Sequence, residues 1–159
     1  MKTTKYQIPA THEGLITLKE TIAQNKRRAK GFHAITWLVE ELDKLKGTEY
    51  AVQCVVAHGP FARGSKTFQQ IDLLFVLENN VDEELAMEFL VDEILSKIYM
   101  EIKILPYLNV LSPERLKLAI RHPTPLMRRI LKEGIVFYGK GGSTHFHSSI
   151  LPSFHSQRM

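Results

Sequence analysis

The chain of 159 residues contains one cysteine, Cys54, and one tryptophan, and its apolar residues do not gather into long runs. A single cysteine cannot form a disulfide within the chain, which argues against a disulfide-stapled secreted domain. Its longest apolar runs, such as 55–57 and 73–77, are far shorter than the about 20 residues that cross a bilayer. Residues 1–14 carry no apolar stretch of signal-peptide length. We therefore expect no membrane segment and a reducing, cytoplasmic setting.

The composition is that of one globular domain, with 44% apolar and 24% charged residues. A chain of this length buries roughly 70% of its extended surface, enough for a core without metal or disulfide. Lys and Arg number 21 against 17 Asp and Glu, giving a net charge of +4 and a pI near 9.2. This balance permits an anionic partner but does not require one.

The N-terminal part of the chain is patterned as helix. Between residues 12 and 46, apolar residues recur at spacings of three and four, as an amphipathic helix requires: Phe32, Ile35, Leu38, Val39, Leu42 and Leu45. Gly31 interrupts the pattern, which leaves open whether the segment is one helix or two. We expect residues 1–47 to form a helical segment that packs on a core domain of residues 48–139.

Strand and helix patterns alternate in the rest of the chain. Short β-branched runs predict strands over 50–57, 70–77, 99–111 and 135–138, and Pro106 confines the third to an edge or a bend. Helix starts are indicated by Asn80 with Glu83, by Ser112-Pro113 and by Thr124-Pro125. The order predicts an α/β fold with a small mixed sheet of about four strands flanked by helices. Residues 140–159, rich in Gly, Ser and His, are expected to be a disordered tail.

One stretch, residues 59–76 (GPFARGSKTFQQIDLLFV), resembles the signature of the polymerase-β-like nucleotidyltransferase superfamily. The family pattern is Gly-Ser, then Ala-Arg-Gly, and about nine residues later Asp-x-Asp on the next strand. Gly59, Arg63, Gly64 and Asp72 occupy matching positions, and the similarity extends over about residues 35–139. It implies a palm-like sheet with an added N-terminal helix, and transfer of a nucleoside monophosphate assisted by two Mg²⁺ ions.

The sequence departs from that signature at the motif serine and at the first aspartate. Pro60 replaces the serine and offers neither a hydroxyl nor an N–H to a phosphate. Gln70 replaces the first aspartate and brings no charge to a cation that prefers carboxylates. The third carboxylate of the family comes from a neighbouring strand, where alignment places Lys103, with Glu101 one step away on the same face. The motif is therefore interpreted as degenerate, with transfer activity weak or lost.

The resemblance also implies a set of candidate site residues. The catalytic carboxylates would be Asp72 and Glu101, which with Gln70 would hold a weakly bound Mg²⁺. The nucleotide triphosphate would be contacted by the turn and by nearby cations: Gly59, Arg63, Gly64, Ser65, Lys66 and Lys103. Each residue also has an ordinary interpretation, because Arg63 can equally hold its own turn and Asp72 can be a plain strand-end carboxylate.

We expect the remaining notable residues, a cysteine, the histidines and two basic clusters, to have structural or solvent-exposed roles. Cys54 lies in an apolar strand and is expected to be a core residue, and His58 beside the turn is more often structural than catalytic. The histidines of the tail lack the accompanying ligands of a metal site. Two basic clusters, residues 26–30 and the set Arg121, Arg128, Arg129 and Lys132, are favoured as solvated faces over a nucleic-acid footprint.

Three functions remain open from the sequence. The first is a nucleotide-binding nucleotidyltransferase of reduced activity. The second is a catalytically silent interaction module of toxin–antitoxin type, in which the N-terminal helix pairs with a helical partner or a second copy. The third is a nucleic-acid-binding module that uses the basic clusters.

Overall fold

The computed structural model describes residues 12–139 and 144–145, with side chains described for 25–139. A mixed five-stranded sheet forms its centre, in the order β3-β2-β1-β4-β5. The strands are β1 (Val52–His58), β2 (Gln70–Leu77), β3 (Leu105–Leu111), β4 (Ile135–Gly139) and the short β5 (Thr144–His145). β2 and β3 are parallel, and the other neighbouring pairs are antiparallel. The predicted class, a small mixed sheet flanked by helices, is confirmed.

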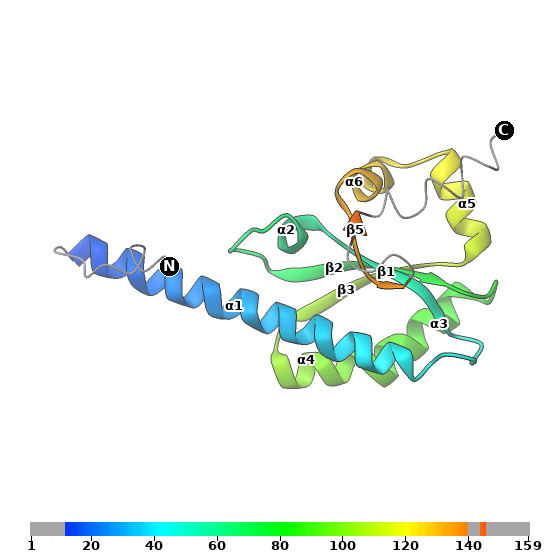
Figure 1. Cartoon of the computed structure of the whole chain (residues 1–159), viewed down its shortest axis with the longest axis horizontal. Coiled ribbons are helices and arrows are strands. Elements are labelled where there is room, and N and C mark those ends of the chain that lie inside the picture. Colours follow the sequence, from blue (N-terminus) through cyan, green and yellow to red (C-terminus); the bar gives the residue numbers. More distant parts are fainter. Residues whose placement is uncertain (1–11, 140–143, 146–159) are drawn as a thin grey trace.

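Helices cover both faces of the sheet (Figure 1). One face carries α1 (His12–Asp43), α3 (Glu83–Leu90), the π-helical turn η2 (Val91–Leu95) and α4 (Ser96–Ile102). The other face carries α5 (Pro113–Arg121) and α6 (Pro125–Glu133), and the one-turn helix α2 (Gly59–Ala62) follows β1. Within the described part of the chain, no helix has the length and apolarity needed to span a membrane.

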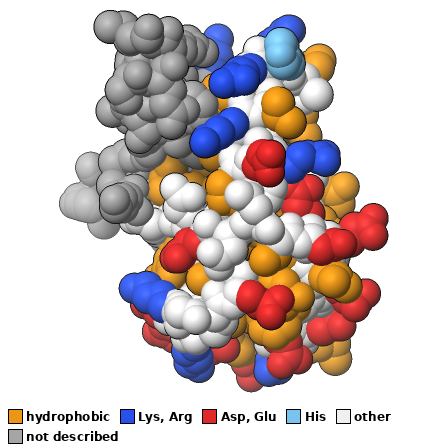
Figure 2. Space-filling model, turned by 90° about the vertical axis from the view of Figure 1, so that its right-hand side faces the viewer, with side chains coloured by type: hydrophobic (Ala, Val, Ile, Leu, Met, Phe, Trp, Pro, Cys, Tyr) orange, Lys and Arg blue, Asp and Glu red, His pale blue; other side chains and the backbone are white. Residues whose placement is uncertain are grey.

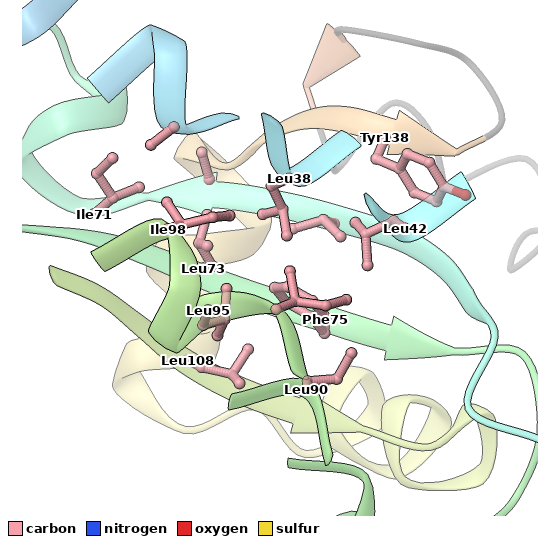
Figure 3. Packing of buried hydrophobic residues seen from close by; sticks show 14 of the residues in the cluster. Leu38, Leu42, Ile71, Leu73, Phe75, Leu90, Leu95, Ile98, Leu108 and Tyr138 are labelled. Atoms are coloured by element: carbon pink, nitrogen blue, oxygen red, sulfur yellow. The ribbon is translucent and has the colours of Figure 1, made fainter. Parts of the chain in front are cut away.

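The alternation of β2 divides the core between the two layers. Ile71, Leu73 and Phe75 pack against Leu38 and Leu42 of α1 and against α3 and α4, as Figure 3 shows. The alternate residues Leu74 and Val76 face the smaller cluster under α5 and α6. Asp72 has the parity of this second set, so the strand directs it toward the α5–α6 layer.

The N-terminal helix is continuous through Gly31. A side chain at this position would meet the ring of Phe61 at 2.5 Å, so the glycine lets α1 approach α2 closely. Leu38 and Leu42, at 2% and 0% exposure, anchor the helix in the main core. The question left open by the sequence is therefore settled as one helix, whose N-terminal half extends beyond the sheet (Figure 1).

The strand predicted over residues 99–111 is wrong in its first part. The helix continues to Ile102, and Lys103 ends it in the left-handed conformation, with φ of 66°. The reason is that Ile98 and Ile102 are both buried and lie one helical turn apart. This spacing fits a helix, although the same apolar residues also fit the predicted strand. β3 begins only at Leu105, at the sheet edge that Pro106 predicted.

The helix caps follow the sequence at two of three starts. The hydroxyls of Ser112 and Thr124 accept hydrogen bonds from the N–H groups of Arg115 and Met127, as predicted. At α3, however, Asp82 is the cap, accepting from Glu84 and Leu85, so the cap predicted at Asn80 is wrong. Asn80 instead accepts a hydrogen bond from the N–H of Glu114 in the first turn of α5. The predicted tail lies outside the described residues except for β5.

Candidate functional site

A tight turn after β1 places the motif residues against one another. Gly59 has φ of +75°, and a side chain there would overlap the carboxylate of Asp72. The turn is closed by backbone hydrogen bonds from Arg63 to Gly59 at 3.1 Å and from Ser65 to Pro60 at 2.9 Å. Glycine is thus required at position 59 by both conformation and space. It lets the end of β1 lie directly against Asp72 on β2.

Asp72 sits between two strands and is held by a neighbour on its own strand. In the sheet register it is opposite His58 on β1 and Tyr107 on β3. Its Oδ1 accepts a hydrogen bond of 2.7 Å from Nε2 of Gln70. Gln70 therefore turns its amide nitrogen, a donor, toward the carboxylate, where a second aspartate would have offered further negative oxygens.

His58 is the buried titratable group of this region. Its side chain is 7% exposed, and its Nε2 has no hydrogen-bond partner among the described residues. Burial lowers the pKa of His58 below its usual 6.5, and Arg129 lowers it further, while Asp72 opposes both. Burial therefore favours the neutral imidazole over the charged form at this position.

A cavity of about 340 Å³ opens over these residues, between the sheet and α6. Its lining comes from the turn, from three strands and from α6: His58, Gly59, Pro60, Arg63, Asp72, Tyr107, Asn109, Leu126, Arg129 and Glu133. We call this the cleft. Nη1 of Arg63 lies 3.2 Å from Oε1 of Glu133, an ion pair whose side chains are 50% and 35% exposed. Arg129 is exposed and has no ion pair with another described residue.

The structure brings together three of the predicted site residues. Gly59, Arg63 and Asp72 line the cleft, and Gln70 contacts it through Asp72. Gly64, Ser65 and Lys66 lie in the loop after α2 and are not part of the cleft lining. Their contact with a phosphate stays a prediction.

Glu101 and Lys103 do not occupy the positions expected from the sequence. Both were assigned to a strand beside β2, but Glu101 lies on α4 and Lys103 ends that helix. Glu101 lines a different hollow, beside Trp37 between α1 and α4, on the other face of the sheet from α6. The pairing of Asp72 with Glu101 in one site is therefore wrong, because the strand prediction started too early.

Sequence reasoning missed the residues that β3 and α6 bring to the cleft. Tyr107 and Asn109 alternate with Leu108 and Val110, which are buried, so they face the α5–α6 layer beside Asp72. This alternation could have identified them if the strand had been started at Leu105. For the two residues that α6 brings to the cleft, Arg129 and Glu133, the sequence offers only a weak indication: they are four residues apart and so share one face of a helix.

The loop after α2 is held by the first basic cluster. Arg28 donates from Nη1 to the carbonyl oxygens of Ser65 at 2.6 Å and Phe61 at 3.2 Å, and its guanidinium stacks on the rings of Phe32 and Phe61. Arg27 donates to the carbonyl oxygens of Phe68 at 2.8 Å and Gln69 at 3.1 Å. α1 is thereby fastened to the loop that carries Arg63.

The cleft does not fit a pair of divalent cations. Asp72 is the only carboxylate that it retains from the motif, and Gln70 already hydrogen-bonds it. Glu133, the other carboxylate of the lining, is paired with Arg63. Within residues 25–139, no group of three or more His, Cys, Asp or Glu side chains is placed to hold a metal ion. Two arginines, Arg63 and Arg129, also line the cleft.

No protein-family model and no curated protein sequence matches the chain. Among solved structures, it is similar to a mutant of the toxin–antitoxin MntA–HpeT, at 12% identity over 65% of this chain and 71% of that chain, with a TM-score of 0.42. A second mutant of MntA–HpeT gives 11% identity, coverage of 75% and 85%, and a TM-score of 0.42. A toxin–antitoxin structure with AMP-PNP gives 12% identity, coverage of 65% and 73%, and a TM-score of 0.40.

Proposed function

We propose that the chain is a nucleotidyltransferase-like protein whose cleft binds a nucleoside triphosphate through arginine side chains, with nucleotide transfer weak or lost. The observation that supports this most is that two arginines, Arg63 and Arg129, line the cleft, and only Arg63 is paired there with a carboxylate, that of Glu133. Arg63 and Arg129 supply positive charge at the position where the resemblance implies metal ions. Guanidinium groups bind phosphate oxygens through two parallel N–H donors, without a bridging cation.

Binding of a phosphate by Arg63 would replace its contact with Glu133. That ion pair is partly exposed, and such pairs contribute about 0–1 kcal/mol, so breaking it costs little. Arg129 needs no such exchange, since it has no ion pair within the described residues. The amide of Asn109 and the hydroxyl of Tyr107 add neutral donors from β3.

The nucleoside part of the ligand would use the mouth of the cleft. Tyr107 is 52% exposed and Leu126 is 42% exposed, so both present apolar surface to which a base can stack. A volume of about 340 Å³ falls at the lower end of the 300–1,000 Å³ typical of ligand pockets. This size suits a nucleotide that is partly open to solvent.

Weak transfer follows from the donor set. Two-metal phosphoryl-transfer enzymes neutralise the attacking and leaving oxygens with cations held by several carboxylates. Here Asp72 remains alone, and its charge is already shared with the amide of Gln70. The ligand would be bound and retained more readily than turned over.

Calorimetric titration with ATP, in EDTA and in Mg²⁺, tests the proposal. We expect binding in EDTA to be at least as tight as in Mg²⁺, because the arginines act on the free phosphates. Arg129→Ala should weaken binding about tenfold, as expected for loss of a charged hydrogen bond. The matched control Lys97→Ala, on α4, should leave binding unchanged. Binding that requires Mg²⁺, or stoichiometric incorporation of label from ATP into an acceptor, would contradict the proposal.

A second candidate function is association through the α1–α4 hollow. Met100 is 65% exposed there beside the half-buried Trp37, and the N-terminal half of α1 extends beyond the sheet. The similar solved structures are toxin–antitoxin assemblies, which is consistent with a protein partner. If a second copy is that partner, Met100→Glu should convert a dimer to a monomer in analytical ultracentrifugation. A wild-type chain that is monomeric at 100 μM, on the order of the concentration at which weak pairs form, would reject self-association.

A further inference from the structure

The helices α5 and α6 on one face of the sheet carry a charge opposite to that of α3, η2 and α4 on the other face. Residues 113–133, which span α5 and α6, contain six Lys and Arg against two Glu. Residues 82–103, which span α3, η2 and α4, contain seven Asp and Glu against two Lys. On the face in Figure 2, a group of Lys and Arg side chains and a His lie at the top and most Asp and Glu lie below, where further Lys and Arg also lie. Positive charge is therefore concentrated on the α5–α6 side of the chain, which the net charge of +4 does not reveal.

The cations of the α5–α6 layer are largely free. Five of them are exposed and have no ion pair or side-chain hydrogen bond with another described residue: Lys117, Arg121, Arg128, Arg129 and Lys132. Arg115, the sixth, lies 4.0 Å from Glu83. Concentrated, uncompensated positive charge on one layer raises the local potential and attracts anions.

The two arginines of the first basic cluster are not available in this way. Arg27 and Arg28 spend their guanidinium donors on loop carbonyls and stack on buried phenylalanine rings. Two clusters that looked alike in the sequence therefore differ: among the cations of the first only Lys26 and Lys30 are exposed, whereas all three arginines of the second are exposed.

The free cations have a regular arrangement that continues into the cleft. Lys117 and Arg121 are four residues apart on α5, as are Arg128 and Lys132 on α6, so each pair shares one helix face. Arg129, on the same helix as the second pair, lines the cleft with the exposed ring of Tyr107. A chain of phosphates on this layer can therefore lead to an aromatic surface.

We propose that the α5–α6 layer binds the phosphodiester backbone of a single-stranded nucleic acid, one end of which reaches the cleft and stacks a base on Tyr107. Repeating negative charge matches the repeated cations, three of which are arginines suited to phosphate. An exposed aromatic ring beside a cationic surface is the combination that binds unpaired bases. This surface goes beyond the proposed function, because nucleotide binding in the cleft requires none of Lys117, Arg121, Arg128 or Lys132.

The test is fluorescence anisotropy of the full chain with labelled oligo(U) and oligo(dT) of twelve nucleotides, from 50 to 300 mM salt. The wild type should bind both, and its affinity should fall with salt by a slope of about −0.7 for each phosphate contacted. The variant Lys117→Glu, Arg121→Glu, Arg128→Glu should bind at least about tenfold more weakly, with a slope shallower by about 2. If this triple variant fails to fold, Lys117→Gln, Arg121→Gln, Arg128→Gln serves in its place.

A control of equal charge change separates the surface from net charge. Lys44→Glu, Lys46→Glu, Lys97→Glu alters exposed lysines away from α5 and α6, and should retain binding within about twofold. Tyr107→Ala should weaken binding about tenfold, with the salt slope unchanged, since stacking is not electrostatic. ATP binding measured on the triple surface variant should stay intact, which distinguishes this proposal from that for the cleft.

Three outcomes would overturn the inference. The first is no oligonucleotide binding at 50 mM salt. The second is equal loss of affinity in the surface and control variants, which would mean net charge alone. The third is equally tight binding of polyglutamate of similar charge, which would assign the layer to acidic proteins.

Discussion

The two basic clusters of the chain share a composition but differ in what surrounds them. The guanidinium of Arg28 donates hydrogen bonds to two carbonyl oxygens and stacks on an aromatic ring. These contacts hold α1 against the loop beside the cleft. Arg121 and Arg128 form no ion pair with another described residue. The difference teaches that a run of cations becomes structural or ligand-binding according to the elements that the fold packs against it.

The largest expected effect is the loss of stability when an arginine of the first cluster is removed. Arg28→Ala should lower the free energy of unfolding by about 2–3 kcal/mol, because two charged hydrogen bonds and two ring contacts are lost. Urea denaturation measures the change. Lys30→Ala, at an exposed neighbour on α1, is the matched control and should change little. A loss below about 0.5 kcal/mol for Arg28→Ala would mean that the first cluster is as free as the second.

Gly31→Ala sharpens the account of the first cluster. An added methyl group would meet the ring of Phe61, which is 3% exposed and packed against Phe68 and Arg28. Overpacking of this kind costs about 1–3 kcal/mol, offset by about 1 kcal/mol of helix propensity. We expect a net loss of about 1 kcal/mol in denaturation, and a gain in stability would show that α1 does not approach the turn so closely.

The pKa of His58 tests the second cluster, since Arg129 acts on it. NMR titration should give His58 a pKa below 6.5, raised by Arg129→Ala and lowered further by Asp72→Asn. With its pKa lowered in the folded state, His58 binds a proton more readily in the unfolded chain. The free energy of unfolding is therefore unaffected by this group above pH 6.5 and decreases as the pH falls below 6.5. His58→Gln should reduce this loss, measured by denaturation at pH 7.5 and pH 5.5. An unchanged pH dependence would place the imidazole in solvent.

The smallest change in stability is expected for the arginines of the second basic cluster. Arg121→Ala and Arg128→Ala should each change the free energy of unfolding by no more than about 0.5 kcal/mol, because neither side chain has a partner in the described structure. Thermal or urea unfolding suffices. A loss similar to that of Arg28→Ala would remove the contrast between the clusters.

Local chemistry made several parts of the fold predictable. β1 and β2 follow from β-branched runs, and the starts of α5 and α6 follow from an N-cap residue before proline. Gly59, Arg63 and Asp72, which the resemblance implies as site residues, line one cleft, and their roles stay predictions. Cys54, expected in the core, is partly buried and packs against the smaller core cluster, and burial raises the pKa of its thiol to about 12.

The remainder depends on long-range packing that the sequence does not state. Isoleucines at 98, 102 and 104 fit both a helix end and a strand, and only packing on α1 and β2 decides where β3 begins. That boundary moved Glu101 out of the site and brought Tyr107 in. Arg129 could not be assigned because nothing local relates α6 to the turn after β1.

The most direct measurement of the central claim is a crystal structure of the chain with Mn²⁺ and a nonhydrolysable ATP analogue, with the anomalous signal of manganese recorded. The account predicts a triphosphate between Arg63 and Arg129 and no manganese peak at Asp72. A pair of ordered manganese ions on Asp72, bridging to the phosphates, would contradict it.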